Sequence, residues 1–90
     1  KIINIHPSLL PSYGGKGMFG SKIHNKVIKN KEKETGITIH YVSNQYDAGE
    51  IIFQKKISIE KNDTVTTLKE KIHKFEYEYY PKVIQSLLIK

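Results

Sequence analysis

The chain contains neither cysteine nor arginine. Without cysteine it can form no disulfide and no thiolate metal site, and this composition is compatible with a reducing cytoplasm. The net charge of +6 comes from lysine alone. Arginine is the usual residue for bidentate contacts with guanine and phosphate, so its absence argues against sequence-specific recognition of nucleic acid. A lysine-rich surface can still attract anionic small molecules.

Long apolar runs are also missing. No segment approaches the roughly 20 apolar residues needed to span a bilayer, and the short run after Lys1 is not a secretory signal. Ninety residues make at most one small domain. The chain nevertheless starts directly in an apolar strand, and such a strand normally lies inside a parallel sheet that is covered on both faces. We therefore expect a carboxyl-terminal part of something longer, or a chain that needs a partner.

The rest of the sequence is organised around residues 4–11, which read Asn-Ile-His-Pro-Ser-Leu-Leu-Pro. Asn4 and His6 are two residues apart at the end of the apolar strand, so their side chains point to the same side. Pro7 then forces the chain away from the sheet. An amide beside an imidazole can polarise a carbonyl group and handle a proton. The alternative is that both side chains only cap a strand end, because so short a pair is a weak motif.

A glycine-rich loop at residues 12–20 follows this segment. It lacks the spacing of a nucleotide-binding loop and is interpreted as a connection that passes close to the site. Ser21 is predicted to cap a helix near residues 22–30. His24 is predicted to lie at the surface or at its boundary. The apolar stripe of this helix is Ile23, Val27 and Ile28.

Two strands are predicted next, at residues 37–42 and 51–59, and the short polar turn between them favours an antiparallel hairpin. Thr38 and His40 share one face of the first strand. They form either a satisfied polar pair or, if this strand neighbours the first one in the chain, a support behind Asn4 and His6. Lys55 interrupts the apolar side of the second strand, which indicates an edge or a bend.

The last element is a helix capped within residues 62–64. Its buried stripe is predicted to be Val65, Leu68, Ile72, Phe75 and Tyr79. Pro81 is expected to kink or end this helix. His73 and Glu76 lie on one helical face, as a surface pair or as the polar wall of a pocket. The order strand, helix, strand, strand, helix predicts an α/β fold.

Four segments together resemble one family. Residues 4–11 resemble the signature of the formyltetrahydrofolate-dependent formyltransferases, and Pro7 after His6 is most similar to phosphoribosylglycinamide formyltransferase. Residues 36–42 with Asp47-Ala48-Gly49, residues 51–54 and residues 76–81 resemble further blocks in the same order. The resemblance implies that residues 1–90 are the carboxyl-terminal portion of a single formyltransferase domain. That domain has a doubly wound, mostly parallel sheet, and its amino-terminal half, with a glycine-containing phosphate loop, is absent here.

The resemblance also implies an activity. The full-length enzyme would transfer a formyl group from 10-formyltetrahydrofolate to the amine of glycinamide ribonucleotide in de novo purine biosynthesis, in the cytoplasm. The chain alone is expected to be inactive. The partners implied are the two small-molecule substrates and the missing amino-terminal half, with no nucleic acid, no membrane and no metal.

Site residues follow from the same resemblance. The catalytic residues would be Asn4, His6 and Asp47. The folate-binding residues would be Asn4, Ser43, Asn44, Gln45, Tyr46 and Asp47. The ribonucleotide-binding residues would be His73, Lys74, Phe75 and Glu76, although His73 and Lys74 depart from the family's commoner choices. Thr38 and His40 would be supporting residues.

The implied chemistry places Asn4 as a hydrogen-bond donor to a tetrahedral oxyanion, with His6 adding positive charge and Asp47 holding His6 in that state. Ser8 is interpreted as support for the loop, because no covalent nucleophile is needed. Formyltetrahydrofolate deformylase and methionyl-tRNA formyltransferase share the Asn-x-His and Asp elements and remain alternatives. A non-catalytic binding or assembly fragment is an alternative of another class.

Overall fold

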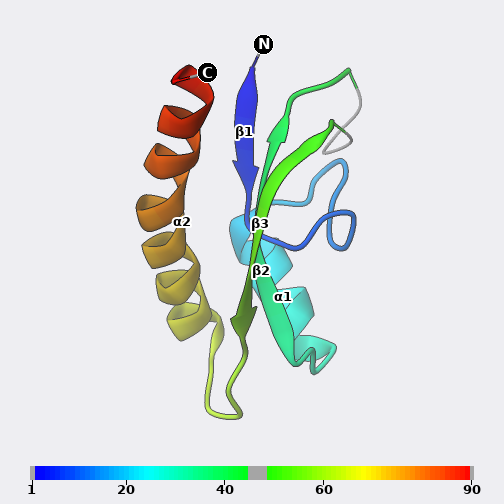
Figure 1. Ribbon diagram of the computed structural model, residues 1–90. Helices are drawn as coiled ribbons and strands as arrows, with labels where there is room; N and C mark the ends of the chain where they lie inside the picture. Colours follow the sequence, from blue (N-terminus) through cyan, green and yellow to red (C-terminus); the bar gives the residue numbers. More distant parts are fainter. Residues whose placement is uncertain (1, 45–48, 90) are drawn as a thin grey trace.

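The computed structural model describes residues 2–44 and 49–89. Its elements are β1 (Ile3–His6), α1 (Gly20–Lys29), β2 (Glu34–Tyr41), β3 (Ile51–Ser58) and α2 (Val65–Leu88). Figure 1 shows α2 running along one side of the sheet, with the loop between β1 and α1 on the other side. The predicted order of strands and helices is confirmed. Neither helix within the described residues is both long enough and apolar enough to cross a bilayer.

The strands form one sheet in the order β1-β2-β3, and both pairs are antiparallel. The predicted hairpin of β2 and β3 is therefore confirmed. The mostly parallel pairing expected for the complete family sheet does not occur among these three strands. The reason is the path of the chain. The connection from β1 through α1 leaves and re-enters the sheet at the same end, so β2 runs back along β1 (Figure 1).

Two clusters of buried side chains hold the layers together. Ile37, Ile57 and Ile72 join the sheet to α2, with Ile5, Phe75 and Tyr79 packed around them. A second cluster joins the two helices and consists of Ile23, Val27 and Leu68. The predicted stripe of α2 thus supplies buried residues to both clusters. Lys55 extends over the ring of Tyr79, with its Nζ atom 5.8 Å from the ring centroid, as suits a lysine on an edge strand.

The start of α2 follows the prediction, and the helix runs on through Pro81. Thr64 is the N-cap of a capping box. Its side chain accepts from the main-chain N–H of Thr67, and the side chain of Thr67 accepts from the main-chain N–H of Thr64. Of the two effects expected of Pro81, a kink or an end, the end does not occur, because the helix continues to Leu88. A proline inside a helix costs about 3 kcal/mol, so the surrounding contacts must offset this cost. Tyr80 supplies one of them, because its hydroxyl donates to the carbonyl oxygen of Ile3 at 3.1 Å.

Helix α1 differs from its prediction at two residues. It begins at Gly20 after an extended Phe19, with no side-chain cap, so Ser21 lies inside the helix and is not its cap. His24 is only 1% exposed and not a surface residue, because α1 packs against α2 on that side. Burial lowers the pKa of His24, and the charges of His73 and Lys69 on α2 lower it further. The Nδ1 atom of His24 is buried without a hydrogen-bond partner.

Replacing His24 by leucine is expected to make the protein less sensitive to acid. The pKa of His24 is below 6.5 in the folded state, so the unfolded chain binds a proton more readily. The stability that depends on neutral His24 is therefore present above pH 6.5 and lost as the pH falls through the lowered value. We expect the melting temperature to fall less in His24→Leu than in the wild type between about pH 7.5 and pH 5. Parallel falls in the two proteins would contradict this explanation.

Candidate functional site

Asn4 and His6 lie on the same face of the sheet as Thr38 and His40. The register places Asn4 opposite His40 and His6 opposite Thr38 in the antiparallel pair of β1 and β2. Side chains directly opposite each other in such a pair share a face. The strands β1 and β2 are therefore neighbours, which is the arrangement that a supporting role for His40 requires.

His6 is buried at the end of β1, with 4% of its surface exposed, whereas Asn4 is exposed. The Nε2 atom of His6 lies 2.9 Å from the main-chain carbonyl oxygen of Tyr13. A carbonyl oxygen can only accept a hydrogen bond, so Nε2 must carry the proton in this contact. The imidazole is thus held by the loop that follows it, and this contact was not predicted from the sequence.

A buried hydroxyl fastens the same loop to the sheet. Thr38 donates to the carbonyl oxygen of Ser8 at 2.7 Å and accepts from the main-chain N–H of Leu10 at 3.0 Å. Gln54 of β3 donates to the hydroxyl of Thr38 at 3.0 Å and to the carbonyl oxygen of Leu10 at 2.9 Å. Ser8 donates to the carbonyl oxygen of Ser12 at 2.6 Å, which confirms its predicted place in supporting the loop. Sequence reasoning missed Gln54, although a polar residue on a strand that neighbours Thr38 was a possible signal.

Thr38→Val is expected to lower the free energy of unfolding by about 2–4 kcal/mol. Valine has nearly the shape of threonine but leaves the polar groups of Ser8, Leu10 and Gln54 without this partner, and each buried group so left costs about 1–3 kcal/mol. Thr66→Val, on the exposed side of α2, is the matched control and should change stability by less than about 0.5 kcal/mol. Denaturant titration measures both, and equal effects would show that the hydroxyl of Thr38 has no special role.

Gly36 of β2 allows the loop at residues 7–12 to lie close to this strand. A Cβ atom at residue 36 would meet the carbonyl oxygen of Lys55 at 2.2 Å and the Cδ2 atom of Leu9 at 2.6 Å. The first of these contacts cannot be relieved cheaply, because the partner atom belongs to the backbone of β3. The glycine of this strand thus permits close packing of residues 7–12 on β2.

Part of the predicted folate-binding turn is described by the structure. Ser43 and Asn44 are exposed and follow one residue after the end of β2. The β2–β3 register shifts between Ile39 and His40, just before this turn, and such bulges are frequent beside active sites. Gln45, Tyr46 and Asp47 lie outside the described residues. The meeting of Asp47 with His6 therefore stays a prediction.

The predicted ribonucleotide-binding residues lie on α2. His73 and Lys74 are exposed, whereas Phe75 and Glu76 are half-buried. The ring of Phe75 packs into the core and stacks on Tyr79 at 5.9 Å between centroids. Burial raises the pKa of Glu76, and the nearby charge of His73 offsets part of this rise. Because α2 packs on the isoleucine face of the sheet, these residues do not share the face of Asn4 and His6.

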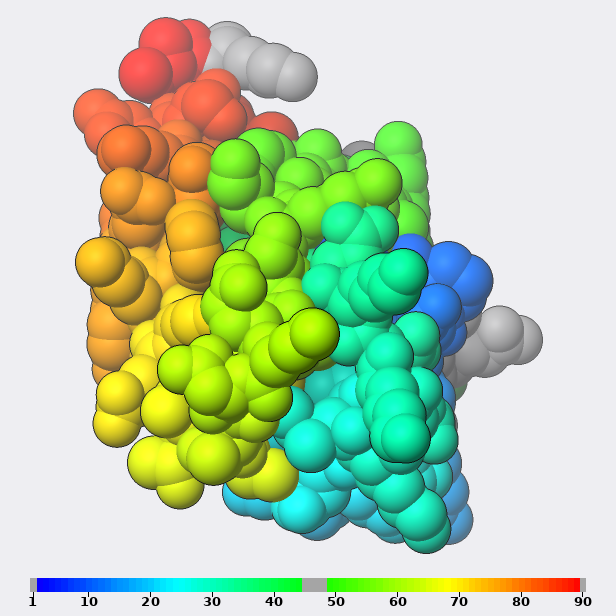
Figure 2. Space-filling model, turned by 90° about the horizontal axis from the view of Figure 1, so that it is seen from below, coloured from blue at the N-terminus to red at the C-terminus, as the bar shows by residue number. Residues whose placement is uncertain are grey.

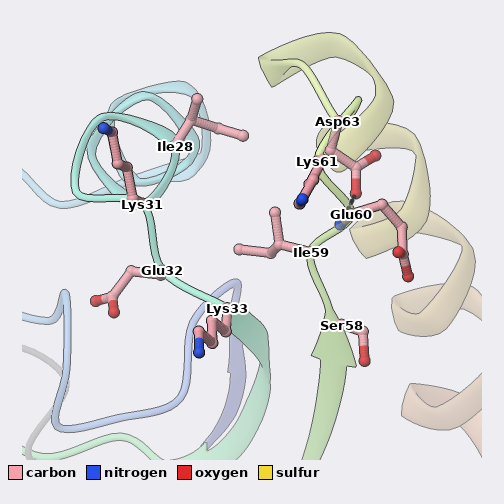
Figure 3. A pocket seen from close by; sticks show the side chains of 9 residues that line it. All are labelled: Ile28, Lys31, Glu32, Lys33, Ser58, Ile59, Glu60, Lys61 and Asp63. Carbon is pink, nitrogen blue, oxygen red and sulfur yellow. Dashed lines mark hydrogen bonds between the residues drawn. The ribbon is translucent and has the colours of Figure 1, made fainter.

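A separate hollow of about 680 Å³ lies where β2 begins and β3 ends. Figure 2 views this end of the molecule, where the segment around residue 60 faces α1 and the start of β2. None of the predicted site residues lines it. In the close-up of Figure 3, Ile28 and Ile59 lie between charged side chains of both signs, and Asp63 is bonded to the main chain of Glu60. The hollow is thus distinct from the candidate site.

No group of three or more histidine, cysteine, aspartate or glutamate side chains in the described part of the chain could hold a metal ion. The chemistry available on the sheet face is that of an exposed amide, a buried imidazole with a fixed Nε2 proton, and a hydrogen-bonded loop.

The profile of the formyl transferase family matches residues 1–84. Phosphoribosylglycinamide formyltransferase of Bacillus subtilis is 48% identical over 88 residues, which cover 98% of this chain and 43% of the relative. The chloroplastic phosphoribosylglycinamide formyltransferase of Vigna unguiculata is 42% identical over 96% of this chain and 28% of its own length. The chain therefore spans less than half of these relatives.

Solved structures agree with these matches. The phosphoribosylglycinamide formyltransferase of Bacillus halodurans superposes with a TM-score of 0.87 at 44% identity, over 99% of this chain and 43% of that one. The enzyme of the same name from Anaplasma phagocytophilum superposes with a TM-score of 0.83 at 40% identity, over 93% of this chain and 39% of that one. The predicted α/β class is confirmed, as a part of the fold that these proteins share.

Proposed function

The chain belongs to the formyl transferase family, and from this premise we propose that the complete protein transfers a formyl group from 10-formyltetrahydrofolate to the amine of glycinamide ribonucleotide. The observation that carries this proposal is the placement of Asn4 and His6 on one sheet face, within a sequence 48% identical to a phosphoribosylglycinamide formyltransferase. The reaction belongs to de novo purine biosynthesis. We place it in the cytoplasm.

The reaction needs few groups from this chain. The substrate amine attacks the formyl carbon, a C–N bond forms, and the carbonyl electron pair moves to oxygen. The exposed amide of Asn4 donates to this oxyanion, and protonated His6 adds charge. Collapse then breaks the bond from the formyl carbon to the folate nitrogen, which takes up the proton lost by the amine. Asp47 holds His6 in its charged state and assists this proton transfer.

The two substrates are assigned to two parts of the chain. Residues 43–47 with Asn4 would hold the folate, and residues 73–76 would help hold the ribonucleotide. Glu76 supports the second assignment, since its half-buried carboxylate has a raised pKa and would gain from a hydrogen-bond donor on a ligand. Thr38 and His40 would keep the loop and the strand in position from behind.

Residues 1–90 would form the carboxyl-terminal portion of a single domain. Two findings support this. The chain covers 43% of the Bacillus subtilis relative, and apolar side chains lie exposed just before β1 and at the end of α2, with Ile2, Leu88 and Ile89 each at least 70% exposed. The missing partner would be the amino-terminal half, which supplies the phosphate loop. Neither nucleic acid nor a membrane is required.

The test is an assay of the complete protein with both substrates. We expect one formylated ribonucleotide for each tetrahydrofolate released, and no turnover when the ribonucleotide is left out. Free formate released without ribonucleotide would indicate a deformylase. Formylation of methionyl-tRNA in place of the ribonucleotide would indicate the tRNA enzyme, and no formyl transfer to any acceptor would support a non-catalytic role.

A further inference from the structure

Tyr13 is held in an unusual conformation by contacts at its far end. Its φ angle is 55°, a region that residues other than glycine rarely occupy unless their surroundings hold them there. Its hydroxyl donates to the Oε2 atom of Glu32 at 2.6 Å and accepts from the Nδ2 atom of Asn30 at 2.8 Å. Its ring also packs against the buried cluster between the two helices. Both partners lie in the segment that connects α1 to β2, so the phenol ties the loop to that segment.

The other end of Tyr13 reaches His6. Its carbonyl oxygen lies 2.9 Å from the Nε2 atom of the imidazole. Tyr13 thus links two sites. Its side chain is clamped by Glu32 and Asn30, and its main-chain carbonyl contacts the imidazole of His6. The hydrogen bond from the phenol to Glu32 raises the pKa of Tyr13, and the bond from Asn30 offsets part of that rise, so the hydroxyl stays a donor at neutral pH.

We propose that Tyr13, clamped by Glu32 and Asn30, is a positioning residue that keeps the proton of neutral His6 on Nε2. When His6 becomes charged, the added proton then goes to Nδ1. This inference rests on the proposed function of His6, and it adds residues that neither the family resemblance nor the relatives' names assign. Which imidazole nitrogen works is set by the hydrogen bond that the other one makes.

Glu32 lines the hollow, and Figure 3 shows its side chain across the hollow from Lys61 and Asp63. Its carboxylate is committed to the hydroxyl of Tyr13 at 2.6 Å. Removal of Glu32 should therefore act on His6 through Tyr13, and removal of the Tyr13 hydroxyl should act by the same route.

The experiment compares Tyr13→Phe, Glu32→Ala and the double variant in the complete protein with ¹⁵N-labelled histidine. The ¹⁵N shifts of the His6 ring report the fraction of neutral imidazole with its proton on Nδ1. We expect this fraction to rise by about fivefold in each single variant, the change that the loss of one ordinary hydrogen bond produces. Because both changes remove the same clamp, the double variant should add little to either one. We also expect kcat to fall by about threefold to tenfold, with KM changed less than about twofold.

Tyr77→Phe and Glu70→Ala, both at exposed residues of α2, are the matched controls and should leave the ring shifts and kcat unchanged. Unaltered ring shifts of His6 in Tyr13→Phe and Glu32→Ala would overturn the proposal, even if kcat fell. If the effect of the double variant equalled the sum of the two single effects, Tyr13 and Glu32 would not act through one shared clamp. Failure of the proposed function gives a different result, namely altered ring shifts in a protein that transfers no formyl group.

Discussion

Replacement of His6 by alanine in the complete protein is expected to lower kcat by about a hundredfold to ten-thousandfold, the usual contribution of a positioned acid or base. His6 is buried on the face that it shares with Asn4, with its Nε2 atom bonded to Tyr13. In the proposed mechanism His6 supplies positive charge beside the oxyanion, and alanine removes it. Steady-state kinetics with both substrates would measure the loss, and far-ultraviolet circular dichroism would verify the fold.

His6→Gln separates catalysis from support. The glutamine amide can still donate to the carbonyl oxygen of Tyr13, but it carries neither a charge nor a labile proton. If His6 is catalytic, His6→Gln should be nearly as inactive as His6→Ala. If His6 only supports the loop, His6→Gln should keep most of the activity, and this outcome would favour the non-catalytic interpretation of the Asn-x-His segment.

The 90-residue chain, assayed alone with both substrates, is expected to show no measurable formyl transfer. By the family resemblance, the proposed site would draw its phosphate contacts and part of its folate pocket from an amino-terminal half, and a substrate held at one end loses the orientation on which the rate depends. The assay should be accompanied by circular dichroism, since α1 and α2 give a strong helical signal when they are folded. Turnover at the rate of the complete protein would refute the proposal that residues 1–90 are one portion of a domain.

Addition of the separately produced amino-terminal half supplies the control for that experiment. If the halves assemble through the exposed apolar side chains beside β1 and at the end of α2, activity should return as their concentration rises. Continued inactivity of a folded chain in the presence of a folded amino-terminal half would show that this apolar surface is not where the halves meet.

The spacing of apolar residues predicted the strands and helices well where one face of the element is buried. Alternating isoleucines predicted β2, helical spacing predicted the buried stripe of α2, and Thr64 began that helix as expected. The departures have physical causes. Of the two effects expected of Pro81, the helix end does not occur, and contacts such as the one from Tyr80 to Ile3 offset its cost. The surface position predicted for His24 was wrong, because a second helix covers this residue. The continuation of α2 through Pro81 and the burial of His24 both depend on residues distant in the sequence, and local spacing carries no information about such residues.

The amino-acid sequence by itself determined the order of strands and helices, the side on which Asn4 and His6 emerge, and the family. The first two follow from residue type and from spacings of two to four along the chain, whereas the family follows from the resemblance of residues 4–11 and three further segments to the formyltransferases. The tertiary structure alone decided which nitrogen of His6 is held, by Tyr13, and how the loop is fastened, by Thr38 and Gln54. The physical reason is that these hydrogen bonds join a loop to other loops and strands, and their partners are chosen by packing in space.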